Sequence, residues 1–280
     1  LGYGPLDAAT LISPRIAPQM IGLGLLEMID ETDLRAHADP EDKDGDGISG
    51  RIRTTWNSEL NAPAVGRFGW KGGTSTVHQQ SAGAFSGDVG ISTELVPGHW
   101  GDCTEKQAVC RNAPNGETAE YEGVEAGKDV LEMVAHYSRN LAVPARRGEG
   151  DPVVLRGKQV FYQNQCASCH MPKFVTRTDT DRPIHSRQLI WPYTDLLLHD
   201  MGPGLADNWP EGDANGQEWR TAPLWGIGLT KTVSDHTQFL HDGRARNLVE
   251  AILWHGGEAE MSKEEFRFLD KLDRNALIAF

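Results

Sequence analysis

The segment Cys166-Ala-Ser-Cys169-His170 constrains this chain more than any other part of its sequence. Cys-x-x-Cys-His is the attachment motif of a c-type haem, in which two thiols add to the two vinyl groups of one porphyrin. The adjacent imidazole reaches the iron from one face, so His170 is the expected proximal ligand. We therefore predict one covalent haem c held by Cys166, Cys169 and His170.

Other uses of the Cys-x-x-Cys pair fit the sequence less well. A zinc site needs a second pair at metal-ligand spacing, and Cys103 and Cys110 are too widely spaced for one. A thioredoxin-type motif should follow a strand, whereas residues 155–162 have a helix-like apolar face. Cys103 and Cys110 are expected to form a loop-closing disulfide, which together with covalent haem indicates a periplasmic location. Nothing around this pair suggests a lowered thiol pKa, which disfavours a dithiol oxidoreductase.

Charge and hydropathy exclude some kinds of binding partner and a membrane-spanning segment. The chain has 280 residues, a net charge of −13 and a pI near 5.2, which argue against nucleic acid or an acidic membrane surface as partner. No apolar run is long enough for a transmembrane helix, so we expect no membrane span. No signal peptide is visible and the first residue is Leu1, so we expect a mature, processed or truncated product.

Periodicity predicts a mainly α-helical protein with long loops and few strands. We expect two domains, residues 1–150 and residues 151–280, joined near a linker at 146–152. The second would be a cytochrome c-like haem domain, and the first a loop-rich helical domain. The predicted helices cover residues 20–29, 76–85, 125–140, 155–162, 248–254 and 263–279.

The ligand on the second face of the iron decides whether the haem carries electrons or binds peroxide. Met171 is too close to His170 to reach that face. His255 is the strongest candidate, because it ends a predicted helix that can present a side chain rigidly. The pattern alone leaves other downstream candidates open, namely His185, His199, Met201, His236 and His241.

Two C-terminal motifs resemble the C-terminal haem domain of the bacterial di-haem cytochrome c peroxidase and MauG superfamily. They are Thr221-Ala-Pro-Leu-Trp225 and His241-Asp-Gly-Arg244 followed by Leu248-Val-Glu-Ala-Ile252. In that superfamily a distal Met or Tyr lies about one turn past the His-Asp-Gly helix, a position that falls on His255 here. The resemblance implies a bis-His haem of lowered potential. We expect Arg244 to neutralise a propionate, and His241 to bond a propionate or lock its own turn.

An N-terminal stretch resembles the peroxidatic domain of the same superfamily. Phe68-Gly-Trp-Lys-Gly-Gly73 places Trp70 at the tryptophan between the two haems, and Gln80 at a distal-pocket glutamine. The family's distal glutamate position is Gly90 here, so Asp88 is the nearest acid that can substitute. The alternatives are a core aromatic for Trp70 and helix capping or loop polarity for Gln80 and Asp88.

The closest resemblance is to the di-haem "thiol oxidoreductase" branch of this superfamily. One departure matters, because its members carry a second Cys-x-x-Cys-His earlier in the chain and this sequence has one. Either this chain is the C-terminal portion of a longer protein or the peroxidatic haem is lost. The branch's marks, spread over nearly the whole chain, are Ser13-Pro-Arg-Ile-Ala-Pro18, Gly22-Leu-Gly-Leu-Leu-Glu27, Asp44-Gly-Asp-Gly-Ile-Ser-Gly-Arg51, Gly66-Arg-Phe-Gly-Trp-Lys71, Leu198-His-Asp-Met-Gly202 and Trp254-His-Gly-Gly-Glu258.

An acidic loop has part of a calcium-binding pattern. Asp42, Asp44 and Asp46 occupy alternating positions, and Gly47 stands where such loops turn sharply. The twelfth position is Arg53 in place of Glu, so this is no complete EF-hand. We predict bound calcium because three close carboxylates repel one another unless neutralised; the alternative is a solvated turn.

Two functions compete at this stage. The first is a di-haem peroxidase-type oxidoreductase, in which electrons enter at the haem of His170 and His255 and pass near Trp70 to a second haem flanked by Gln80 and Asp88. The second is a non-enzymatic single-haem electron carrier or a subunit of a larger cytochrome assembly. The expected partners are a redox protein that donates or accepts electrons, and an N-terminal fragment or other cytochrome subunits.

Overall fold

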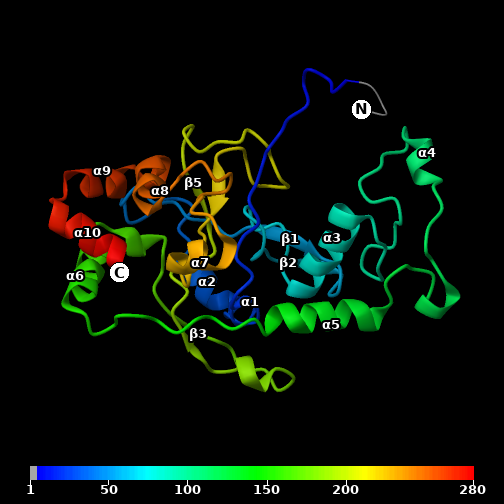
Figure 1. Cartoon of the computed structure of the whole chain (residues 1–280), viewed down its shortest axis with the longest axis horizontal. Coiled ribbons are helices and arrows are strands. Elements are labelled where there is room, and N and C mark those ends of the chain that lie inside the picture. The colour runs from blue at the N-terminus through cyan, green and yellow to red at the C-terminus, as the bar shows by residue number, and fades with distance from the viewer. Residues whose placement is uncertain (1–4) are drawn as a thin grey trace.

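The computed structural model describes residues 5–280, a chain of short helices joined by long loops (Figure 1). The α-helices are α1 (Leu23–Glu27), α2 (Glu31–His37), α3 (Val77–Val89), α4 (Ala108–Arg111), α5 (Lys128–Arg139), α6 (Pro152–Gln163), α7 (Thr230–Ser234), α8 (Leu248–Trp254), α9 (Glu260–Phe268) and α10 (Lys271–Ala279). Single 3₁₀ turns are η1 (Ala119–Tyr121), η2 (Cys166–Ser168), η3 (Pro183–His185), η4 (Ile227–Leu229) and η5 (Gly257–Ala259). The prediction of a mainly α-helical chain is confirmed, while the cytochrome c-like form of the second domain stays a prediction.

Strands contribute only three small antiparallel pairs. β1 (Thr54–Asn57) pairs with β2 (Ala62–Val65), and β3 (Phe174–Val175) pairs with β4 (Leu189–Ile190). β5 (Leu198–Asp200) pairs with β6 (Glu218–Arg220), with His199 opposite Trp219. The β1–β2 pair closes a short hairpin, the other two pairs each close a longer loop, and none of the three forms an extended sheet.

Capping residues explain where helix boundaries differ from those predicted. The predicted helix 263–279 is two helices, because the Asp270 side chain accepts a hydrogen bond from Asp273 N and starts α10 as an N-cap. α2 is absent from the predictions, and it begins where Asp30 accepts from Thr32 N. The predicted helix 20–29 is shorter, since Gly22 has a left-handed φ of 68°.

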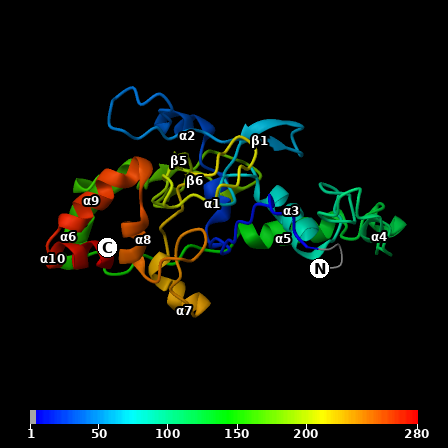
Figure 2. The same ribbon diagram turned by 90° about the horizontal axis from the view of Figure 1, so that it is seen from above.

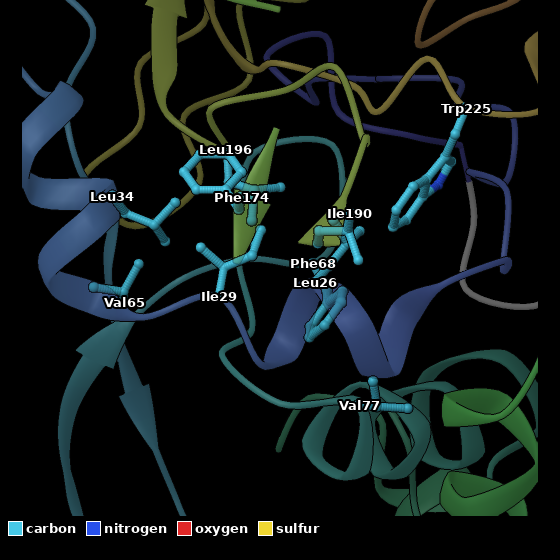
Figure 3. Close-up of a cluster of buried hydrophobic side chains, with 10 residues drawn as sticks. All are labelled: Leu26, Ile29, Leu34, Val65, Phe68, Val77, Phe174, Ile190, Leu196 and Trp225. Carbon is cyan, nitrogen blue, oxygen red and sulfur yellow. The ribbon is translucent and has the colours of Figure 1, made fainter. Parts of the chain in front are cut away.

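The larger buried core draws on both halves of the sequence. Figure 3 shows ten buried side chains gathered between α1, α2, β2, β3 and β4. They are Leu26, Ile29, Leu34, Val65, Phe68, Val77, Phe174, Ile190, Leu196 and Trp225. Residues from both sides of the predicted boundary at 150/151 thus share one core, and the division into two domains stays a prediction.

A second core lies wholly within residues 151–280. Helices α6 and α10 pack so closely that a Cβ at Gly157 would overlap the carbonyl oxygen of Ala276. Partly buried Cys166 and Ala167 pack against this cluster. Its buried members are Val160, Phe161, Tyr193, Phe266 and Leu277. The Cys-x-x-Cys-His segment is therefore built onto an apolar base.

The molecule is elongated, and different helices lie at its two ends (Figures 1 and 2). One end holds α6, α8, α9 and α10, and the other holds α3, α4 and α5. Cys103 and Cys110, with Cα atoms 6.3 Å apart, form the predicted disulfide in the loop region around α4. No helix within residues 5–280 is long and apolar enough to cross a membrane.

Candidate haem centre

The Cys-x-x-Cys-His segment is a tight turn that follows α6. Gln165 adopts a left-handed conformation (φ 57°) that ends the helix and begins η2. His170 N then donates to Cys166 O at 2.9 Å, which brings the two ends of the motif together. Cys166 and Cys169 are free thiols and partly buried. This local fold presents both sulfurs and one imidazole from five residues of chain.

Burial makes both thiols weak acids. It raises the pKa of Cys166 to about 12 and also raises that of Cys169. A redox dithiol needs a lowered thiol pKa, so this pair is poorly suited to thiol–disulfide exchange. Two protonated, partly buried thiols are compatible with the covalent attachment that the motif predicts.

The His170 ring is oriented by a backbone carbonyl. Its Nδ1 lies 2.9 Å from Tyr193 O, and because a carbonyl only accepts, Nδ1 must carry the proton. The lone pair is then on Nε2, for which the described residues offer no hydrogen bond. Burial lowers the His170 pKa to about 4, so the ring is neutral at pH 7. Neutral imidazole with Nδ1 held by a carbonyl is the form that ligates iron.

The His255 ring is oriented by a backbone carbonyl in the same way as the His170 ring. It stands at the C-cap of α8, and its Nδ1 lies 2.7 Å from Ala251 O, which again leaves the lone pair on Nε2. Burial lowers its pKa as well. Ile252, three residues before His255, packs against the same apolar cluster as Cys166, which places the end of α8 near the cysteine turn.

The donor set fits a covalently bound haem with two axial imidazoles. Two thiols and two neutral imidazoles with free Nε2 atoms lie at one end of the molecule, beside the apolar cluster of α6, α9 and α10. The Phe161 ring lies 6.5 Å from the His170 ring, between centroids, and Ile252 of α8 packs on the same cluster. Such a wall favours a porphyrin, whose faces are apolar.

The other candidate histidines differ from His255 in what their rings contact. Both nitrogens of His199 meet carboxylates, Asp195 at 2.9 Å and Glu258 at 2.7 Å. The Nε2 of His185 lies 3.2 Å from Arg139 O. His241 stacks on Trp219 with ring centroids 3.7 Å apart. His199 therefore has no ring nitrogen left for a metal, and the His241 ring is packed against two tryptophans, whereas His255 keeps Nε2 without a hydrogen-bond partner among the described residues.

His241 and Arg244 lie on the turn that leads into α8. The buried His241 ring contacts Trp70 edge-on at 6.5 Å as well as Trp219 face-on. Arg244 is held by Asp242 at 2.7 Å, and its guanidinium carbon lies 4.9 Å above the Trp254 ring, next to His255. Arg244 is therefore placed near the haem-binding end, while His241 is packed into its own turn.

Trp70, Gln80 and Asp88 are not gathered at this centre. Trp70 donates from Nε1 to Ile16 O at 2.6 Å, and its ring contacts His241 edge-on. Gln80 and Asp88 are exposed on α3, and Gln80 accepts from Thr74 Oγ1 at 2.6 Å. α3 packs on α5 at the end remote from α6 and α8 (Figure 1).

The acidic loop is folded in the manner its pattern suggests. One carboxylate oxygen from each of Asp42, Asp44 and Asp46 lies within 4.8 Å of the others. Gly47 has φ 82°, and its N–H donates to Asp42 Oδ1 at 3.1 Å. Arg53, at the twelfth position, is buried and donates to Lys71 O at 2.9 Å, so it contributes nothing to the loop.

Comparison with protein-family models finds one that covers nearly all of this chain. The model is described as "di-haem oxidoreductase, putative peroxidase" and matches residues 6–280. The chain belongs to the di-haem oxidoreductase family. No curated protein and no solved structure was found to match it. Membership implies a haem cofactor, in agreement with the thiols and imidazoles described above.

Sequence reasoning missed the groups that surround the ligands. The carbonyls of Tyr193 and Ala251 fix the two rings, and such backbone partners leave no trace in residue type. Asp195 and Glu258 were also missed as partners of His199. The sequence did contain a signal for Glu258. Two motifs of the resemblance, Leu198-His-Asp-Met-Gly202 and Trp254-His-Gly-Gly-Glu258, contact each other through His199 and Glu258.

Proposed function

We propose that this chain carries the electron-transfer haem c of a di-haem peroxidase-type oxidoreductase. Cys166 and Cys169 would form the two thioether links, and His170 and His255 would hold the iron from opposite faces. The observation that carries this proposal is the matched pair of imidazoles, each with Nδ1 bonded to a carbonyl and Nε2 left free. An iron with two strong protein ligands is suited to electron transfer.

The residues of the chain do three things in this proposal. Tyr193 and Ala251 orient the imidazoles through their carbonyls, so that both lone pairs stay available. The apolar surroundings of the cluster favour the neutral form of both rings. Arg244 is placed to neutralise a carboxylate near Trp254. When bound, the haem would supply reversible one-electron oxidation and reduction.

The enzymatic role extends the proposal to the first half of the chain. Electrons would pass near Trp70, between Ile16 and His241, toward a second haem with Gln80 and Asp88 as distal polar groups. The family description supports peroxidase-like activity. Because Gln80 and Asp88 are exposed in this chain, this step would require a further segment to cover α3, such as an N-terminal fragment bearing the other haem.

A second candidate function is a single-haem electron carrier or a cytochrome subunit. The single Cys-x-x-Cys-His favours it. Ferric electron paramagnetic resonance separates the two functions: a high-spin signal beside a low-spin one supports the peroxidase, and a low-spin signal alone supports the carrier. Either role needs a redox partner protein, and the disulfide together with covalent haem supports a periplasmic location.

Calcium is a further proposed cofactor. The close approach of the carboxylates of Asp42, Asp44 and Asp46 supports it, because uncompensated negative charges at this spacing repel one another. The ion would lie in the loop that leads directly into Ser49 and Gly50.

Substitution of His255 tests the ligand set. His255→Ala should convert ferric haem from low to high spin, because one axial position opens, and His255→Met should restore low spin at a higher potential. His136→Ala, an exposed histidine on α5, is the matched control and should leave the spectrum unchanged. A low-spin spectrum that survives His255→Ala would remove His255 from the ligand set.

A further inference from the structure

A buried group of charges lies beside the candidate haem centre. His199 is 3% exposed and sits between Asp195 (1%) and Glu258 (10%), 2.9 and 2.7 Å from their carboxylate oxygens. Each carboxylate contacts a different ring nitrogen, so the ring is held as a cation, and these hydrogen bonds raise its pKa well above the usual value despite burial. We call Asp195, His199 and Glu258 the carboxylate–histidine triad.

The triad touches both segments that supply haem ligands. On one side, Asp195 N donates to Cys169 O at 3.0 Å, and Cys169 Sγ lies 3.6 Å from His199 Nδ1. On the other side, Glu258 comes three residues after His255 in the turn that follows α8. Glu258 Oε1 accepts from Asp200 N at 3.0 Å. The triad therefore connects the cysteine turn with the His255 turn.

Two glycines allow this connection to be close. A Cβ on Gly202 would lie 2.9 Å from Gly257 N, and a Cβ on Gly257 would overlap the carbonyl oxygen of Asp200. Both have positive φ, 72° and 55°. The backbone of the His255 turn thus lies directly against residues 200–202, with no side chain between them.

The triad also reaches the segment that follows the acidic loop. Ser49 N and Ser49 Oγ donate to the two oxygens of Glu258 at 3.0 and 2.9 Å. A Cβ on Gly50 would lie 2.5 Å from His199 Cε1, so this segment packs directly on the imidazole. Ser49 is two residues past Gly47, where the acidic loop turns.

Burying three charges in this way costs free energy. An isosteric apolar cluster is often as stable as a buried ion pair or more so, and the main gain from such a group is a defined geometry. The geometry defined here is the position of the His255 turn relative to the cysteine turn. Stability alone gives no reason for charges at this place.

We propose that Glu258 and His199 are positioning residues that clamp the His255 turn against the cysteine turn and so keep His255 on the iron. This inference rests on the proposed ligation by His255. Without the clamp, His255 dissociates more often, while the haem stays attached through Cys166 and Cys169 and coordinated by His170.

Cyanide binding to the ferric holoprotein tests the clamp, because cyanide binds only when His255 has left the iron. Glu258→Gln and His199→Gln should each speed cyanide binding on the order of tenfold, as expected where about 1.4 kcal/mol is lost from the closed state. Glu264→Gln, whose carboxylate pairs with Arg267 on the surface of α9, is the matched control and should bind at the wild-type rate. Equal rates in wild type, Glu258→Gln and His199→Gln would overturn the proposal.

Two further variants keep the result interpretable. If Glu258→Gln fails to fold, Ser49→Ala removes one donor to Glu258 and should still speed cyanide binding, and an unchanged rate would count against the clamp. His255→Ala should bind cyanide fastest of all. If His255→Ala binds at the wild-type rate, the ligation itself is wrong; if it binds faster while the Glu258 and His199 variants do not, only the clamp is wrong.

Discussion

Histidines in this protein are sorted by what their two ring nitrogens meet. In His170 and His255, Nδ1 is hydrogen-bonded to a backbone carbonyl and Nε2 has no hydrogen-bond partner among the described residues. In His199, both ring nitrogens are hydrogen-bonded to carboxylates. The first pattern yields a neutral metal ligand, and the second yields a fixed cation. One residue type therefore supplies two opposite functions within the same end of the molecule.

Asp207 gives a residue-scale prediction about acid stability. Burial by itself raises its pKa, but hydrogen bonds from Ser13, Trp209 N, Lys71 and Arg15 lower it to about 2. A carboxyl with a depressed folded pKa stabilises the fold above its unfolded pKa of about 3.9, and this contribution is lost as pH falls through about 2. We expect about 1 kcal/mol, since solvent screens part of the charge.

Urea unfolding of the wild type and Asp207→Asn at pH 7 and pH 2 measures this contribution. The variant should be less stable at pH 7, partly because it leaves the fully buried Lys71 without its anion. The stability gap between the two proteins should narrow at pH 2, where about half of the folded molecules have Asp207 protonated. A gap that is the same at both pH values would show that Asp207 carries no linked charge.

At the residue scale, the sequence predicts those residues whose role follows from their type and spacing. Cys166, Cys169 and His170 are recognisable because spacing alone defines the motif. His255 required both its place at a helix end and the resemblance. Asp195 was not recognisable, because a lone carboxylate in a loop looks like surface polarity until the fold buries it at 1% exposure.

At the scale of elements, short helices and turns place the chemistry while the longer helices support them. The cysteine turn needs the left-handed Gln165, and the His255 turn needs Gly257. The predicted helices 125–140, which has regular apolar spacing, and 248–254 are both confirmed, as α5 and α8. α2, and the break between α9 and α10, escaped prediction because capping by Asp30 and Asp270 decided them.

The acidic loop gives a prediction at the element scale. Calcium binding should raise the thermal midpoint of the wild type, because a ligand that binds only the folded state stabilises it by mass action. Asp44→Asn removes one of the three carboxylates and should abolish most of this shift, while Glu132→Gln on α5 should keep it. Thermal unfolding in millimolar calcium and in chelator is the measurement. Identical midpoints for the wild type in both conditions would rule out calcium in this loop.

At the scale of the whole molecule, one core joins segments that the sequence suggested were separate. The sequence pattern shows where local elements begin and end, but long-range packing between residues such as Leu26 and Phe174 has no periodic signal. The proposed haem site lies beside the second core, which is local to residues 151–280. The prediction was therefore most accurate where contacts are close in sequence.

Membership of the di-haem oxidoreductase family and the single Cys-x-x-Cys-His together define the remaining functional choice. Trp70, His241 and Trp219 form a continuous aromatic contact between residues far apart in the sequence. In the proposed peroxidase, this aromatic contact would lie on the electron route between the two haems. The iron content per chain and the spin state of the ferric haem would distinguish the peroxidase from the single-haem carrier.

The most direct test is the haem content and ferric electron paramagnetic resonance of the wild-type protein, purified after expression with a c-type haem attachment system. The proposed ligand set predicts haem that stays with the protein in acidified acetone, with a low-spin signal from an iron bound by two imidazoles. Protein that is colourless, releases its haem into acidified acetone, or shows only a high-spin signal would contradict it.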